Sequence, residues 1–267
     1  MVPSTKIQVL TDLSPFIKVY TERLLGTPHV PPSLEDPTTG VSSKDTTISP
    51  NVSARLYLPK LSDPTQKLPI LVYYHGGGFC VESAFSFQYH RYMNILSAKS
   101  GALVVSVEYR LAPEHLLPAA YDDSWYALKW AGSESLPGNV KILGAILSYP
   151  HFAGSNPTGD EDIASRLWLF AYPSAPSGVD NPSINPLADG APSLSTLGFS
   201  KIIVNMAGND DFTPRGLAYA DGVKNSGWKG ELEVVVDEGE GHCYHIIDPE
   251  TDKAKNLIKH LGSFISQ

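Results

Sequence analysis

Short apolar runs alternate with stretches of helical spacing along most of the chain. Strands are predicted where apolar residues follow one another or alternate with polar ones, and helices where they recur every three or four positions. The predicted strands cover residues 41–48, 52–58, 70–74, 102–109, 140–148, 201–207 and 231–236. The predicted helices cover residues 13–25, 87–100, 121–130, 163–172, 214–226 and 249–265.

From residue 70 onward strands and helices alternate, which predicts a mostly parallel central sheet with right-handed crossovers and flanking helices. A chain of 267 residues, 42% of them hydrophobic, can bury one large core, so we expect a single α/β domain over residues 1–267. Residues 1–36 and parts of the Pro- and Ser-rich segment 149–200 are expected to lie over other parts of the fold as cap segments, since a connection as long as 149–200 usually forms a lid or pocket wall.

Charge and cysteine content narrow the possible partners. The net charge of −8 and the lack of a basic cluster argue against binding to nucleic acid. No apolar run reaches the ~18 residues of a membrane helix, and the first residues lack the pattern of a signal peptide. Two cysteines make no disulfide framework, which suits a reducing compartment. We expect a cytoplasmic protein; its oligomeric state cannot be inferred from these features.

The chemistry centres on residues 68–79, LPILVYYHGGGF, where a buried strand runs into His75 and three glycines. Gly76, Gly77 and Gly78 have no side chains, so the backbone can turn sharply and point its N–H groups into open space. Two such N–H groups can hold an oxyanion, as in the HGGG-type oxyanion hole of lipases and esterases. The alternative is an ordinary glycine turn.

An acid and a histidine follow the last two predicted strands. Asp210 comes just after the sixth strand and His242 just after the seventh, so both should lie at the carboxyl edge of the sheet, with the glycine turn. An acid can orient a histidine and stabilise its charged form, which makes the histidine a general base. Asp211 competes with Asp210, and His245 competes with His242, although an apolar setting favours a packing role for His245.

Six passages spread over nearly the whole chain carry a specific resemblance. They are YYHGGGFCVESAFSFQYHRY, VSVEYRLAPEHLLPAAYDDSW, VKILGAILSYP, YPSAPSGVDNPSINPLADGAPS, SGWKGELEV and GHCYHIIDPET. The chain resembles plant carboxylesterases of the α/β-hydrolase superfamily, close to the 2-hydroxyisoflavanone dehydratase-like group. The resemblance implies an α/β-hydrolase fold, an oxyanion hole at Gly77 and Gly78, and Asp210 and His242 as triad acid and base. It also implies small-molecule esters or related plant metabolites as substrates.

The chain departs from that family at the nucleophile. The elbow pattern G-x-S-x-G needs two glycines four positions apart, and no pair of glycines here has that spacing. The family has a central strand, the elbow and a helix between the counterparts of Trp130 and Ala131. Here the join resembles a deletion of roughly 55 residues. We expect a marginal fold that lacks this strand and helix. The strand at 140–148 could close the sheet by moving beside that at 70–74.

No other residue is predicted to replace the missing serine. Ser148 ends a strand that could approach His242, but a tyrosine and a proline follow it in place of a tight glycine turn. Cys80 and Cys243 lie close to the motifs in sequence, and each is expected to be a small buried hydrophobic residue.

Three functions stay open at this point. The first is a carboxylesterase scaffold that is inactive or impaired because it lacks the serine. The second is a non-hydrolytic dehydratase or cyclase, in which His242 abstracts a proton and the Gly77 and Gly78 amides hold an enolate oxygen. The third is a small-molecule binding protein. No metal is expected, because His242 and His245, although three positions apart, have no carboxylate residues beside them that could complete a metal site. No cofactor is expected, because no P-loop or dinucleotide fingerprint occurs.

Overall fold

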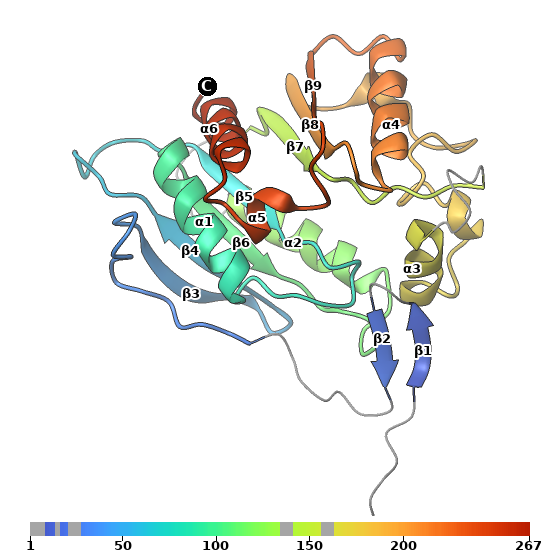
Figure 1. Cartoon of the computed structure of the whole chain (residues 1–267), viewed down its shortest axis with the longest axis horizontal. Coiled ribbons are helices and arrows are strands. Elements are labelled where there is room, and N and C mark those ends of the chain that lie inside the picture. Colours follow the sequence, from blue (N-terminus) through green and yellow to red (C-terminus); the bar gives the residue numbers. More distant parts are fainter. Residues whose placement is uncertain (1–8, 14–16, 21–27, 134–140, 156–162) are drawn as a thin grey trace, which may run out of the picture.

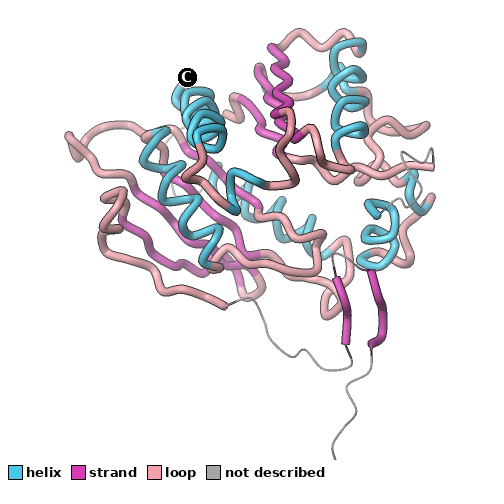
Figure 2. Tube along the Cα trace, viewed as in Figure 1, coloured by secondary structure: helices cyan, strands magenta, loops and turns pink. Residues whose placement is uncertain are grey.

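The computed structural model describes residues 9–13, 17–20, 28–133, 141–155 and 163–267, and shows an α/β architecture with two main sheets (Figure 1). The strands are β1 Val9–Leu13, β2 Ile17–Tyr20, β3 Ser42–Ser49, β4 Val52–Leu58, β5 Ile70–Tyr74, β6 Leu103–Glu108, β7 Gly144–Ser148, β8 Lys201–Ala207 and β9 Glu231–Asp237. The helices are α1 Phe87–Ser100, α2 Ala119–Ser133, α3 Ile163–Ala171, α4 Thr213–Asn225, α5 Tyr244–Ile247 and α6 Asp252–Ser266. Figure 2 shows how the helices flank the strands.

The strand ladder is interrupted between β5 and β7. The first sheet has the order β3-β4-β6-β5, antiparallel at β3/β4 and β4/β6 and parallel at β5/β6. The second sheet has the order β7-β8-β9 and is parallel throughout. Within the described residues no ladder joins β5 to β7. The expected closure of the sheet, with β7 beside β5, is therefore wrong.

The strands on either side of the interruption differ in burial from the strands next to them. β6 and β8 are buried along almost their whole length, as parallel strands inside an α/β fold usually are. In contrast, every residue of β5 and β7 keeps some exposure to solvent. Their sequences predict strands covered on both faces, so within the described part of the chain each is less covered than its composition predicts.

One helical layer holds the two sheets together. α1 and α6 cover one face, where a single apolar cluster includes Val104 of β6 and Ile203 of β8 (Figure 1). Elsewhere the cluster around α2 that includes Val105 is separate from the cluster around α4 that includes Val204, and a further cluster around α3 takes in Ala120 of α2 and Phe212 before α4. The α1/α6 layer therefore spans the interruption with one cluster that contains residues of β6 and β8.

The N-terminal segment forms a hairpin in place of the predicted helix over residues 13–25. β1 and β2 pair antiparallel, so the helix is wrong for residues 13 and 17–20, while residues 14–16 and 21–25 lie outside the described part. β1 contacts α3, the predicted helix of the 149–200 segment (Figure 1). The two predicted cap segments thus meet, and their role over a pocket stays a prediction.

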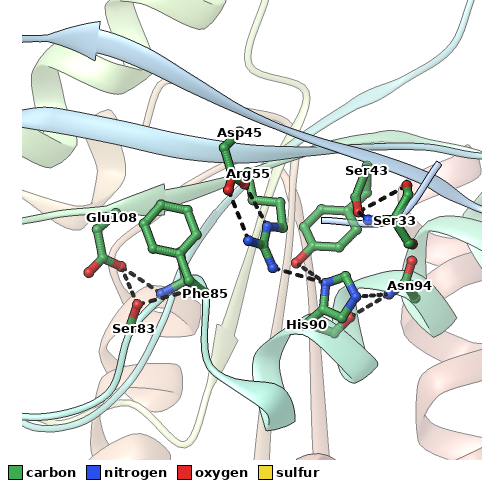
Figure 3. A network of polar contacts seen from close by, with 11 residues as sticks. Ser33, Ser43, Asp45, Arg55, Ser83, Phe85, His90, Asn94 and Glu108 are labelled. Carbon is green, nitrogen blue, oxygen red and sulfur yellow. Dashed lines mark hydrogen bonds and ion pairs between the residues drawn. The ribbon is translucent and has the colours of Figure 1, made fainter. Parts of the chain in front are cut away.

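A buried charged network fastens β3, β4 and α1 (Figure 3). Arg55 in β4 is 1% exposed and donates two hydrogen bonds to Asp45 in β3, at 2.6 and 3.0 Å. His90 of α1 lies within reach of both Arg55 and Tyr57, since its Nδ1 is 3.3 Å from the Arg55 Nη1 and 3.1 Å from the Tyr57 hydroxyl. A buried guanidinium needs such a carboxylate, because an unpaired charge in the interior is costly.

Candidate active site

The glycine turn after β5 has a geometry that only glycine accommodates well. Gly77 has a φ of +111°, and a Cβ there would lie 2.1 Å from the carbonyl oxygen of Val81. Its own carbonyl accepts hydrogen bonds from the N–H groups of Cys80 and Val81, which closes the turn. Gly78 follows with a φ of +57°. None of the described residues accepts a hydrogen bond from the N–H of Gly77 or Gly78, whereas the N–H of Gly76 has an acceptor.

The first two residues of the motif support the turn. The N–H of Gly76 donates to the hydroxyl of Tyr89 at 3.0 Å, so this amide is already used. The His75 ring stacks on Tyr109 at 4.3 Å between centroids, and the Tyr109 hydroxyl donates to the His75 carbonyl. Burial lowers the pKa of His75 to about 4, which keeps the ring neutral at pH 7. The sequence did not reveal the two tyrosines, because they come from α1 and the end of β6.

Gly77→Ala is expected to lower the free energy of unfolding by about 2 kcal/mol, through the clash with Val81 and the left-handed backbone. Gly78→Ala is the matched control, because a Cβ there would meet Leu167 at an ordinary 3.5 Å. It should cost only about 1 kcal/mol, from its positive φ. Urea unfolding of both variants measures the difference, and equal losses would contradict the assigned turn geometry.

Asp210 and His242 meet at the carboxyl edge of the second sheet. Asp210 follows β8, and its Oδ2 lies 2.7 Å from the Nδ1 of His242, which follows β9. The Asp210 side chain is 3% exposed and that of His242 is 41% exposed, so the imidazole faces solvent while the carboxylate is enclosed. Asp211 is exposed and makes no such pair. Of the two competing acids, the structure therefore joins Asp210 to the histidine.

The pair changes the protonation of His242. Burial lowers its pKa, but the hydrogen bond with Asp210 and the adjoining Cys243 side chain outweigh burial and raise the pKa to about 10. At neutral pH the resting protein therefore holds an imidazolium next to a carboxylate. In a serine triad the neutral imidazole accepts the proton of the nucleophile. His242 must therefore lose its proton before it can act as a base.

Asp210→Asn is expected to move the pKa of His242 from about 10 toward its ordinary value of 6.5, because the anionic partner is gone. A titration of the histidine ring protons by NMR measures this shift. In the unsubstituted protein the raised pKa stabilises the fold fully below about pH 6.5, and the contribution is lost as the pH rises through 10. An unchanged His242 titration in the variant would refute the pairing.

His245 is a packing residue, as its apolar setting predicts. It is fully buried, and its Nδ1 lies 2.8 Å from the hydroxyl of Tyr149, on which its ring stacks. Burial lowers the pKa of His245 to about 3. A neutral, enclosed ring of this kind has no access to a substrate, which leaves His242 as the candidate base.

Two of the three residues considered as substitutes for serine, Ser148 and Cys80, are not paired with His242, whereas the side chain of the third, Cys243, adjoins it. The Ser148 hydroxyl donates to the Oδ1 of Asn205 in β8 at 2.6 Å and is therefore not paired with His242. Cys80 is buried, and burial raises the pKa of its thiol to about 12, which fits the predicted hydrophobic role. Cys243 is partly exposed, so the prediction that it is buried is wrong.

A chain of aromatic rings connects the glycine turn with His242. Phe79, directly after the glycines, lies 6.3 Å from the ring of His151, which lies 5.3 Å from Phe212. Phe212 in turn lies 5.1 Å from His242. The turn and the acid–base pair thus border one aromatic cluster. Phe79 directly follows the three glycines, and Phe212 lies two positions after Asp210. This closeness in sequence is the one signal that could have pointed to them.

Within the described residues, no group of three or more His, Cys, Asp and Glu side chains could hold a metal ion. None of the helices in the same part of the chain is both long and apolar enough to cross a membrane. The strand order, with a glycine turn after β5, an acid after β8 and a histidine after β9, defines an α/β-hydrolase.

Comparison with known proteins identifies the family. Residues 71–154 match the family model of the alpha/beta hydrolase fold. 2-Hydroxyisoflavanone dehydratase of Glycyrrhiza echinata is 46% identical to this chain over 320 residues, with 98% of each chain covered. Catharanthine synthase of Catharanthus roseus is 40% identical, with 98% of this chain and 97% of the other covered. A hyperthermophilic esterase from the archaeon Pyrobaculum calidifontis has a similar structure, with a TM-score of 0.70 at 26% identity over 84% of this chain and 85% of that one. The chain belongs to the plant carboxylesterase-like family of α/β-hydrolases, which confirms the predicted fold class and resemblance.

The alignment with the Glycyrrhiza protein is longer than this chain. It runs over 320 positions, whereas 98% of 267 residues is about 262, so about 58 positions have no residue of this chain opposite them. Nearly the whole of both chains is aligned, so these positions are gaps within this chain.

Proposed function

We propose that this chain is a carboxylesterase-type scaffold for small-molecule esters, inactive or impaired as a hydrolase because its serine nucleophile is absent. The observation that carries the proposal is the 2.7 Å pair of Asp210 and His242 in a chain without a G-x-S-x-G pattern. The interrupted ladder between β5 and β7 and the gaps against the Glycyrrhiza protein support a missing segment between Trp130 and Ala131.

The retained groups have definite roles in such a scaffold. The free amides of Gly77 and Gly78 would bind the oxyanion that develops on the ester carbonyl. His242, oriented by Asp210, would take the proton of the attacking group. Without a serine hydroxyl no covalent acyl intermediate forms, and only direct attack by water remains.

A fluorescent fluorophosphonate tests the proposal directly, since it reacts with an activated serine. The pure 267-residue chain is expected to stay unlabelled, while an active esterase in the same reaction is labelled. A single labelled serine, located by peptide mapping and lost in His242→Gln, would show that another residue has replaced the nucleophile and would overturn the proposal.

The second candidate is a dehydratase or cyclase that needs no covalent step, favoured by the names of the Glycyrrhiza and Catharanthus relatives. His242 would abstract a proton, and the Gly77 and Gly78 amides would hold the enolate oxygen. Because the pKa of His242 is about 10, the free base is a minor species at pH 7. The rate of dehydration of 2-hydroxyisoflavanone would then rise with pH up to about 10, and loss of that rise in Asp210→Asn would support this function.

A small-molecule binding role and a cytoplasmic location stay predictions beside these two. Binding alone would leave the Asp210–His242 pair without a chemical task, which argues mildly against it. A receptor role would be supported by a ligand that binds equally well to His242→Gln and to the unsubstituted protein.

A further inference from the structure

Two strand edges have no partner within the described part of the chain. β5 pairs only with β6, and β7 pairs only with β8, so each leaves a row of backbone N–H and C=O groups on its other side. Such a row is a template for another strand, and natural edges are usually protected by charged residues. The outer strands β3 and β9 carry such charges, whereas β5 (ILVYY) and β7 (GAILS) carry none. The sequences of β5 and β7 are therefore those of inner strands.

On the face that carries α2 and α4, the strands of the two sheets belong to different apolar clusters. The apolar clusters around these two helices are separate there, while the opposite face has one continuous cluster. α2 also leaves two large aromatic side chains in solvent, Trp125 at 59% and Tyr126 at 47% exposure. A helix lying between α2 and α4 would join the two clusters.

We propose that a separate polypeptide docks at this place, with an apolar strand of about five residues between β5 and β7 and an amphipathic helix between α2 and α4. The inference rests on the proposed function in one respect, because it takes a segment to be missing between Trp130 and Ala131. About 58 positions of the alignment with the Glycyrrhiza protein have no residue of this chain opposite them, which is enough for one strand, a turn and a helix. The occupant is thus a strand–turn–helix segment of the kind that this chain lacks.

A peptide with the sequence of the Glycyrrhiza protein at the unmatched positions is the probe. Labelled with fluorescein and titrated with the full 267-residue chain, it should give a saturable rise in anisotropy with one peptide per chain. Hydrogen exchange should show the outward amides of β5 and β7 slowed about tenfold or more, with those of β3 and β9 unchanged. The absence of saturable binding, or protection of β3 or β9 in place of β5 and β7, would overturn the inference.

A matched control peptide carries proline at the centre of its strand, which removes a donor from the ladder. It should bind at least about tenfold more weakly, because insertion between two strands needs that hydrogen bond. Equal binding of both peptides would mean that no strand is inserted. The fluorophosphonate reaction of the chain alone separates the two proposals: a labelled chain overturns the proposed function, whereas an unlabelled chain that binds no peptide overturns only the docking.

Discussion

A chromogenic acetyl ester should be hydrolysed by this chain on the order of a million-fold more slowly than by the same chain with a G-x-S-x-G segment restored. In a serine triad, loss of the serine alone costs about as much turnover as loss of all three groups. The free Gly77 and Gly78 amides would still stabilise an oxyanion, so a small residual rate above that in buffer is expected.

The restored chain is built by inserting, between Trp130 and Ala131, the corresponding segment of a relative that carries the G-x-S-x-G pattern. Its matched control has the inserted serine replaced by alanine, which keeps the strand and helix and removes only the hydroxyl. Initial rates over a range of ester concentrations compare all three proteins. Brisk turnover by the 267-residue chain itself would contradict the absence of a nucleophile.

Local elements could be predicted closely because their signals are local. β4 and β8 have the predicted bounds, and α1 begins and ends as predicted because Gly101 adopts a φ of +65° at its C-terminus. The meeting of Asp210 and His242 also follows from the sequence, since each comes directly after a strand and the carboxyl ends of parallel strands lie at one edge.

Features that depend on contacts between distant segments could not be predicted. The β1–β2 hairpin replaces an expected helix, because a short amphipathic segment can satisfy either period and its pairing decides. The partial exposure of β5 and β7 depends on a neighbour whose absence does not alter their own sequences. Likewise, the ring contacts of Phe212 and His151 near His242 join three separate loops, and no spacing rule relates them.

Asp45→Ala is expected to reduce the free energy of unfolding by about 3 kcal/mol, a large share of the ~5–15 kcal/mol of a typical domain. The change leaves the Arg55 guanidinium, whose side chain is 2% exposed, without its carboxylate between β3 and β4 (Figure 3). This loss of unfolding free energy lies at the lower end of the range for a broken buried ion pair, because the Asp45 side chain is 42% exposed and water can reach the vacated place.

The matched control is the double variant Asp45→Ala with Arg55→Met, in which the unpaired charge is also removed. Since a methionine fills much of the arginine stem and carries no charge, the double variant should recover most of the lost stability. Urea unfolding followed by circular dichroism compares both variants with the unsubstituted chain. If the double variant were less stable than Asp45→Ala, the cost would come from lost packing with Phe85 and His90 and not from an unpaired charge.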